Sequence, residues 1–245
     1  MTYSDVAFII PSRIGSTRLP NKALADIGGK AMIEHVVSRL NTGSVNNLYV
    51  ATDSEEIVEK VSDAGGIAIM TSEDCPTGSD RVYEAFQKIP HNDKIKYIIN
   101  VQGDMPFVDY RVLEQIIEKL KNTDFDVVTP VVKVGNDIAN SDSNVKVVAD
   151  INDKALYFSR SVIPHGAEEF LYHVGIYGYR SGALEKFVKL NEAQYESVEK
   201  LEQLRALENG MSIGVIVSNE IPISVDTHED LEKAREYYAK LAAKK

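Results

Sequence analysis

A short cationic segment, residues 11–22, holds the densest group of side chains that could bind a small anion. It reads Pro11-Ser-Arg-Ile-Gly-Ser-Thr-Arg-Leu-Pro-Asn-Lys22 and follows a predicted buried strand. In open α/β sheets, ligands bind beyond the carboxyl ends of strands, where backbone N–H groups and cations can hold a triphosphate. We therefore expect nucleotide contacts from Pro11, Ser12, Arg13, Ser16, Thr17, Arg18 and Lys22.

The alternative for the cationic segment is a solvated basic loop. Three cations within ten residues are nevertheless unusual in a chain whose formal net charge is -10. The pattern GxxxxGK[ST] is absent from the sequence, so the segment is not a P-loop.

Two aspartates are candidate ligands of a metal ion. Asp104 closes the run Asn100-Val-Gln-Gly-Asp104 after a predicted strand, so Gln102 and Asp104 should emerge at the same sheet edge as the cationic segment. Asp226 follows another short apolar run. Mg²⁺ accepts two carboxylates completed by waters and phosphate oxygens. Alternatively, Asp104 caps a turn and Asp226 favours a helix N-terminus.

The segment Thr77-Gly-Ser-Asp-Arg81 is expected where a loop opens a helix. Its small residues, including Ser79, would let backbone groups approach a ligand closely, and Arg81 could anchor the loop or contact a nucleotide. Taken alone, the segment is also an ordinary helix cap.

Composition and charge narrow the class of protein. The chain has 245 residues, of which 44% are hydrophobic, enough for one sizeable core or two small lobes. The sequence pI of about 5.1 argues against a nucleic-acid partner. A single cysteine, Cys75, excludes an intramolecular disulfide and metal sites built on several thiolates. With no secretory pattern at the N-terminus and no long apolar window, we expect a soluble, cytoplasmic protein without a membrane partner.

Short apolar runs alternate with helical patterns through the first part of the chain. Strands are predicted at Val6 to Ile10, Leu48 to Thr52, Ile67 to Met70, Tyr97 to Val101 and Asp126 to Val132. Helical spacing is present in residues 32–40 and 112–120. This alternation predicts an α/β protein with a mixed, mostly parallel, Rossmann-like sheet and helices on both faces.

After about Asp142 the pattern changes to closely spaced strands. Further strands are predicted at Val145 to Ala149, Ala155 to Phe158, Leu171 to Tyr179 and Ile213 to Val217, with helices at 198–208 and 228–241. Thr227 and Asp230 predict the cap of the last helix, and its buried stripe would be Leu231, Ala234, Tyr238 and Leu241. We expect a nucleotide-binding core of residues 1–141 and 210–245, and a smaller subdomain of residues 142–209.

Seven motifs together resemble one enzyme family. They are PSRIGSTRLPNK at 11–22, TGSDR at 77–81, NVQGDMP at 100–106, ALYFSR at 155–160, HVGIYGY at 173–179, LEQLR at 201–205 and VDTHEDL at 225–231. In this order they look like the 3-deoxy-manno-octulosonate cytidylyltransferases, which couple CTP to the eight-carbon acidic sugar Kdo. The resemblance implies a nucleotide-diphosphosugar-transferase fold, Mg²⁺ dependence, a homodimer and a role in supplying CMP-Kdo for lipopolysaccharide.

The same resemblance implies roles for individual residues. The family's metal-binding aspartates match Asp104 and Asp226, and its cytidine-binding loop matches residues 77–81. The CTP contacts would thus extend to Ser79, Arg81 and Gln102, and the catalytic set would be Arg13, Arg18, Lys22, Asp104 and Asp226. The Kdo pocket would be lined by Gln102, Arg160, His173, Tyr177, Glu202 and Gln203.

Alternatives remain for the sugar-binding positions. His173 and Tyr177 lie four apart on a predicted strand and could simply pack on one face. Glu202 and Arg205 could form a surface ion pair of little value. Met105 stands where many members have an acidic residue, Tyr172 stands where a basic residue often occurs, and the stretch 163–173 is short.

The implied reaction is attack of the anomeric 2-hydroxyl of Kdo on the α-phosphorus of CTP, with pyrophosphate leaving in line. Three alternatives stay open: activation of 8-amino-Kdo, activation of a sialic acid, and a nucleotide-sensing module without turnover.

Overall fold

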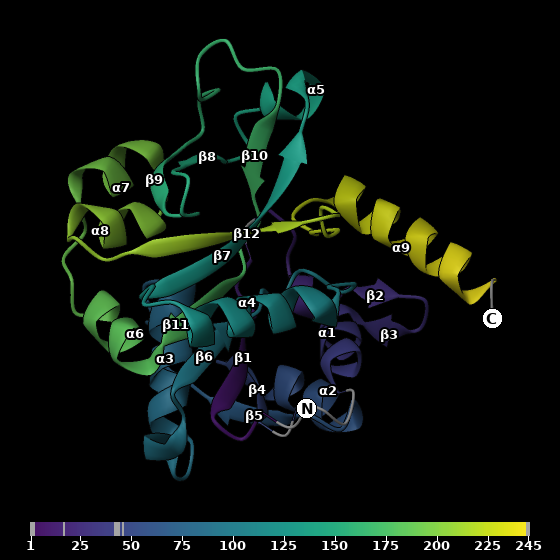
Figure 1. The fold of residues 1–245 in the computed structure, drawn as a ribbon. Coiled ribbons are helices and arrows are strands. Elements are labelled where there is room, and N and C mark those ends of the chain that lie inside the picture. The colour runs from purple at the N-terminus through teal and green to yellow at the C-terminus, as the bar shows by residue number, and fades with distance from the viewer. Residues whose placement is uncertain (1–2, 17, 42–44, 46, 244–245) are drawn as a thin grey trace. The chain divides into compact units, whose positions relative to one another are not determined.

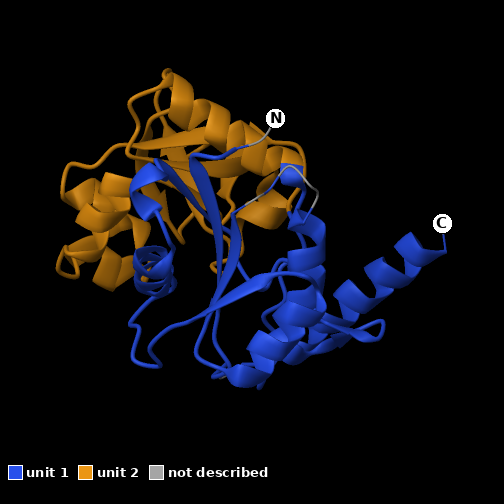
Figure 2. Cartoon of the chain, turned by 90° about the horizontal axis from the view of Figure 1, so that it is seen from below, with its two compact units in different colours: residues 1–110, 222–245 blue, residues 111–221 orange. Residues whose placement is uncertain are grey.

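The computed structural model describes residues 3–16, 18–41, 45 and 47–243, and Figure 1 shows the order of their elements. The chain divides into two compact units, residues 1–110 with 222–245, and residues 111–221 (Figure 2). Within the described residues, no helix is long and apolar enough to cross a membrane.

The first unit is built on four parallel strands in the order β5-β4-β1-β6. These are β1 (Val6–Ser12), β4 (Leu48–Thr52), β5 (Ile67–Met70) and β6 (Tyr97–Asn100). β1 pairs with β4 on one side and with β6 on the other, and five of its residues, Val6 to Ile10, have no exposed surface. A strand buried on both faces reads as a continuous apolar run, which is why β1 and β6 were predictable. The edge strand β5 is also a short apolar run, although Ile67 and Met70 are 54% and 40% exposed.

Helices of the first unit connect these strands or follow them. They are α1 (Met32–Leu40), α2 (Glu55–Asp63), α3 (Gly78–Lys88) and α9 (His228–Ala242), with short 3₁₀ turns at Lys22–Leu24 and Asn92–Lys94. A small hairpin joins β2 (Asp26–Ile27) to β3 (Lys30–Ala31). The predicted cap of α9 is confirmed, because the Thr227 hydroxyl accepts a hydrogen bond from the Asp230 amide and the Asp230 carboxylate accepts one from the Thr227 amide.

The predicted buried stripe of α9 is only half right. Leu231 and Ala234 are 5% and 0% exposed, whereas Tyr238 and Leu241 are half-exposed. The ring of Tyr238 packs edge-on against His35 in α1, with ring centroids 4.9 Å apart. The first two turns of α9 therefore provide most of its buried contact.

The second unit contains six strands: five follow the order β11-β7-β10-β8-β9, and the sixth, β12, also pairs with β7. They are β7 (Val127–Val134), β8 (Lys146–Ala149), β9 (Ala155–Ser159), β10 (Phe170–His173), β11 (Tyr177–Arg180) and β12 (Ile213–Ser218). Only β12 runs parallel to β7. Its helices are α4 (Tyr110–Asn122), α5 (Asn136–Ala139), α6 (Ser181–Val188), α7 (Gln194–Glu199) and α8 (Gln203–Glu208).

The units differ in their bounds from the expected 1–141 with 210–245 and 142–209. The cause is β7, which pairs with β12 from Val127↔Ile213 to Val132↔Ser218 and also pairs with β10 and β11. These ladders tie residues 127–134 and 213–218 to the second unit.

Two predicted elements are each divided in the structure. The strand expected at 171–179 is two strands, because the Ile176 amide turns back to donate to the Val174 carbonyl oxygen at 2.8 Å, opposite Pro130, which has no N–H for the ladder. The helix expected at 198–208 is α7 and α8, because Lys200 has the left-handed φ of 56° that ends α7.

Candidate active site

A cavity of about 390 Å³ in the first unit lies beyond the carboxyl ends of β1 and β6. Its walls come from the cationic segment, the start of α3, the turn after β6 and the residues before α9. They include most of the predicted nucleotide-binding residues, namely Pro11, Ser12, Arg13, Ser16, Arg18, Lys22, Arg81 and Gln102, and both predicted metal-binding residues, Asp104 and Asp226. Thr17, the other predicted contact in the segment, lies outside the described residues.

Gly103 allows the turn after β6 to lie directly against the end of β1. A Cβ atom at Gly103 would be 2.9 Å from the Pro11 carbonyl oxygen, closer than such contacts occur in proteins. Only glycine fits this close approach of two backbones. Gln102 and Asp104, on either side, are thereby held in the cavity wall next to Pro11 and Ser12.

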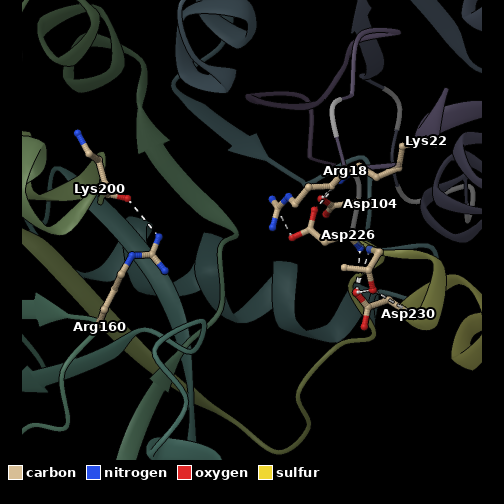
Figure 3. A network of polar contacts seen from close by, with 8 residues as sticks. Arg18, Lys22, Asp104, Arg160, Lys200, Asp226 and Asp230 are labelled. Carbon is tan, nitrogen blue, oxygen red and sulfur yellow. Dashed lines mark hydrogen bonds and ion pairs between the residues drawn. The ribbon is translucent and has the colours of Figure 1, made fainter. Parts of the chain in front are cut away.

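Lys22 joins the two predicted metal-binding aspartates (Figure 3). Its Nζ lies 2.7 Å from Asp104 Oδ2 and 2.9 Å from Asp226 Oδ1. Burial lowers the pKa of Lys22, but the charge of Asp104 and the hydrogen bonds to both carboxylates outweigh it, so the pKa is raised above 10.5. Lys22 is therefore an ammonium ion throughout the neutral range.

A backbone hydrogen bond fixes the two aspartates relative to each other. The Val225 amide donates to the Asp104 carbonyl oxygen at 2.9 Å, which brings residues 104 and 226 together from distant parts of the chain. Their carboxylates then converge on one point. The described residues contain no group of three or more His, Cys, Asp or Glu side chains suited to a metal ion. Two converging carboxylates nonetheless match Mg²⁺, which takes its other ligands from waters and phosphates.

The other cations of the segment are more exposed than Lys22. Arg18 Nη2 lies 3.3 Å from Asp226 Oδ2, and the Arg18 side chain is 68% exposed. Arg13 is also exposed and lines the cavity. Both guanidinium groups are thus available to an anion entering from solvent.

The start of α3 forms another wall of the cavity. The segment 77–81 opens a helix, as predicted, and Thr77 caps it by accepting from the Asp80 amide at 3.2 Å; Thr77 and Gly78 line the cavity. Ser79 is buried, 2% exposed, and is not among the lining residues. Helix N-termini favour anions, so this wall suits a negatively charged ligand.

Arg81 anchors the loops, one of the two roles considered from the sequence. Its side chain is 4% exposed, with Nη2 2.9 Å from Asp53 Oδ2 and Nη1 2.7 Å from Thr71 Oγ1. Asp53 was missed in the sequence analysis. Its position directly after β4, at the same end of the sheet as Asp104 after β6, was the signal that could have found it.

Cys75 lines the same cavity as a neutral thiol. Burial, together with a hydrogen bond to Glu84 Oε2 at 3.1 Å, raises the pKa of Cys75 to about 11. A thiol protonated at neutral pH is a poor nucleophile.

In the second unit, Arg160 is held between α7 and the loop before β8. Its Nε donates to the Glu199 carbonyl oxygen at 2.9 Å, and its Nη1 donates to the Asp142 carbonyl oxygen at 3.2 Å. Its Nη2 donates to the Lys200 carbonyl oxygen at 3.3 Å (Figure 3). The Glu199 carboxylate accepts from the Arg160 amide at 2.9 Å. These contacts orient the guanidinium without neutralising it through a side-chain carboxylate.

His173 and Tyr177, for which packing on one face was the alternative, have their ring centroids 5.5 Å apart. His173 is 7% exposed, and burial lowers its pKa from 6.5 to about 3, so its imidazole is neutral. Its Nε2 lies 3.0 Å from Thr129 Oγ1. The Tyr177 hydroxyl donates to Gln203 Oε1 at 3.3 Å.

Gln203, a predicted sugar-binding residue, has a buried polar atom without a hydrogen-bond partner within the described part of the chain. That atom is the side-chain Nε2. Glu202 is half-buried beside it at the start of α8. Arg205, the other residue of the suggested surface pair, is instead buried and bidentate to Glu196, at 2.8 and 2.5 Å.

Comparison with known proteins identifies the family. The sequence profile described as Cytidylyltransferase matches residues 7–213. The 3-deoxy-manno-octulosonate cytidylyltransferase of Rickettsia typhi is 56% identical over 234 residues, covering 96% of this chain and 97% of the relative. The chain belongs to the 3-deoxy-manno-octulosonate cytidylyltransferase family.

Solved structures support the same family and the fold. A CMP:2-keto-3-deoxy-manno-octonic acid synthetase complexed with CTP is 37% identical, with a TM-score of 0.91 and coverage of 97% of this chain and 99% of that one. A cytidylyltransferase from Leptospira borgpetersenii, 18% identical, has a TM-score of 0.65 over 96% of this chain and 87% of its own, and shows the fold alone. The predicted fold class and enzyme class, a nucleotidyltransferase, are confirmed.

Met105 stands where many members of the family have an acidic residue, and its surroundings favour an apolar side chain. Met105 is 7% exposed, and its amide donates to the Gln102 carbonyl oxygen at 3.3 Å, so its side chain points into the interior. An acidic side chain in the same orientation would be buried, at a high cost in desolvation.

Proposed function

We propose that this cytidylyltransferase transfers CMP from CTP to the 2-hydroxyl of Kdo, giving CMP-Kdo and pyrophosphate. The observation that carries the proposal is one cavity lined by three cations and by two aspartates whose carboxylates converge on Lys22. The names of its relatives, which specify cytidylyl transfer and Kdo, provide the identity of the substrates.

In the proposed complex, the triphosphate of CTP lies along the cationic segment. Lys22 is the least exposed of the three cations, so water screens its charge least. Arg13 and Arg18 add positive charge from the solvent-exposed part of the cavity wall. The start of α3 and the Pro11 backbone contact the rest of the nucleotide. Charge neutralisation here favours departure of pyrophosphate, because negative charge builds up on the leaving group.

Asp104 and Asp226 would hold Mg²⁺. The bound ion would screen phosphate charge and acidify the sugar hydroxyl. Lys22, which contacts both carboxylates, keeps them oriented. No separate protein base is required for loss of the hydroxyl proton.

The sugar would be bound by residues of the second unit. Arg160, which no side-chain carboxylate neutralises among the contacts described above, suits the Kdo carboxylate. The buried Nε2 of Gln203 suits a sugar hydroxyl, since an unpaired buried amide is costly. His173 is neutral and therefore serves as a hydrogen-bonding or packing group, not as a cation.

In the reaction itself, the Kdo 2-oxygen forms a bond to the α-phosphorus while the bond from that phosphorus to the bridging oxygen of the β-phosphate breaks. The hydroxyl proton leaves to solvent. Positioning and electrostatics supply most of the rate increase in such transfers.

A homodimer is the proposed assembly, located in the cytoplasm and supplying lipopolysaccharide synthesis. The second unit exposes several large apolar side chains: Ile151 at 99%, Leu156 at 58%, Val198 at 73% and Val217 at 49%. A second copy of the chain would cover such a surface. Light scattering coupled to gel filtration should give twice the mass of the chain.

The direct test is incubation with CTP, Mg²⁺ and separate acidic sugars, with detection of pyrophosphate and of the CMP-sugar. We expect the fastest release with Kdo. A preference for 8-amino-Kdo or a sialic acid would correct the acceptor, and CTP binding without pyrophosphate from any sugar would support a nucleotide-sensing module.

A further inference from the structure

Asp53 contacts two walls of the nucleotide cavity without lining it. One carboxylate oxygen, Oδ1, accepts from the Ile14 amide in the cationic segment at 3.0 Å. The other, Oδ2, accepts from Arg81 Nη2 in α3 at 2.9 Å. Ile14 lies between the lining residues Arg13 and Ser16, so a single carboxylate connects the segment to the helix.

This connection is buried and anchored to the sheet. The side chains of Arg81 and Asp53 are 4% and 7% exposed. Arg81 Nη1 donates to Thr71 Oγ1 at 2.7 Å, and the Thr71 hydroxyl lies 3.1 Å from the Thr52 carbonyl oxygen at the end of β4. Both charges are largely removed from water, so neither exchanges its partner for solvent at low cost.

We propose that Asp53 is a positioning residue for the nucleotide: it holds the cationic segment and the start of α3 in the one arrangement that fits CTP. The inference rests on the proposed function only in taking CTP as the ligand of this cavity. Asp53 acts through Ile14 and Arg81 and touches no reacting atom.

The two donors that meet at Asp53 explain why a carboxylate is needed. An asparagine has one acceptor oxygen and one NH₂ group at this end. If that oxygen accepts from the Ile14 amide, the NH₂ group faces the Arg81 guanidinium; if the amide is flipped, the NH₂ group faces the Ile14 N–H. In either orientation one donor is left without its acceptor.

The first experiment compares CTP binding by Asp53→Asn and the unaltered protein, measured by calorimetry. We expect the dissociation constant to rise at least about 10-fold, because without the Asp53 carboxylate the cationic segment and the start of α3 are no longer held together. The KM for CTP should rise by a similar factor, with a smaller fall in kcat and an unchanged KM for Kdo.

Glu196→Gln is the matched control for general loss of stability. Glu196 and Arg205 form a buried pair in the second unit, with side chains 9% and 10% exposed. Both variants should unfold at lower temperature, and only Asp53→Asn should lose CTP affinity. A folded Asp53→Asn protein that binds CTP within twofold of the unaltered one would overturn the proposal.

Thr71 provides an independent test should Asp53→Asn not fold. Thr71→Val keeps the shape but removes the acceptor of Arg81 Nη1, and Thr71→Ser keeps the hydroxyl. CTP binding should weaken about threefold or more in the valine variant and recover in the serine variant. Equal affinities in the two would refute the positioning role, whereas absence of CTP binding by the unaltered protein would refute the proposed function itself.

Discussion

Replacing Lys22 by methionine removes one charge from the nucleotide cavity and keeps most of the side-chain volume. In the protein, that ammonium lies within 2.9 Å of two carboxylates and is 19% exposed. A hydrogen bond to a charged group is worth about 1.5 to 3 kcal/mol. The dissociation constant of CTP should therefore rise about 10- to 150-fold. CMP has no β- or γ-phosphate and should lose less.

Arg18→Met is the matched comparison, because it removes a cation of the same segment. Arg18 is 68% exposed and 3.3 Å from Asp226, so water screens its charge. Exposed ion pairs contribute about 0.2 to 1 kcal/mol, which corresponds to about 1.5- to 5-fold in CTP affinity. The structure thus ranks Lys22 above Arg18, a difference that sequence alone does not predict.

Calorimetry with CTP and with CMP, at one Mg²⁺ concentration, measures both effects. Thermal unfolding of each variant checks that the protein remains folded at the binding temperature. The reasoning fails if Lys22→Met loses CTP and CMP affinity equally, or if Arg18→Met loses more CTP affinity than Lys22→Met.

Three further predictions concern the two aspartates, Arg160 and His173. Asp104→Asn and Asp226→Asn should each stay folded and lose at least about 100-fold in kcat, with partial recovery at high Mg²⁺; full activity of Asp226→Asn would return that residue to a helix-capping role. Arg160→Met should raise the KM for Kdo with CTP affinity intact, and a loss of thermal stability alone would favour a packing role. His173, whose pKa falls from 6.5 to about 3 on burial, takes up a proton on unfolding between those values. Acid should therefore cost about 1.4 kcal/mol of stability per pH unit in that window, and His173→Gln should reduce this dependence in urea unfolding at pH 7 and pH 5.

The first unit was largely predictable because its signals are local. Each parallel strand is a short apolar run, and the residues just after β1 and β6 carry the cations and the aspartate that meet in the cavity. The helical spacing of residues 32–40 also matches α1. The placement of Asp226 beside Lys22 depends on a contact across 204 residues of chain, which only the family resemblance suggested.

Where the sequence analysis failed, the deciding contacts were tertiary. The break at Lys200 is a left-handed backbone conformation at a residue type that favours helices. Ser79 lies in the first turn of α3, and its burial depends on how the helix is rotated against β1. The low pKa of His173 arises from burial, which the spacing of His173 and Tyr177 left open.

The hydrogen bond from the Val225 amide to the Asp104 carbonyl joins two segments that a ribosome makes at different times. A ribosome has already produced the cationic segment, α3 and Asp104 when residues 222–245 are still to come. The first unit includes those last residues, and Asp226 is among them. A nascent chain therefore has the cations that attract a nucleotide well before it has both carboxylates. The two carboxylates can meet at Lys22 only after the segment that carries Asp226 has packed against the turn that carries Asp104.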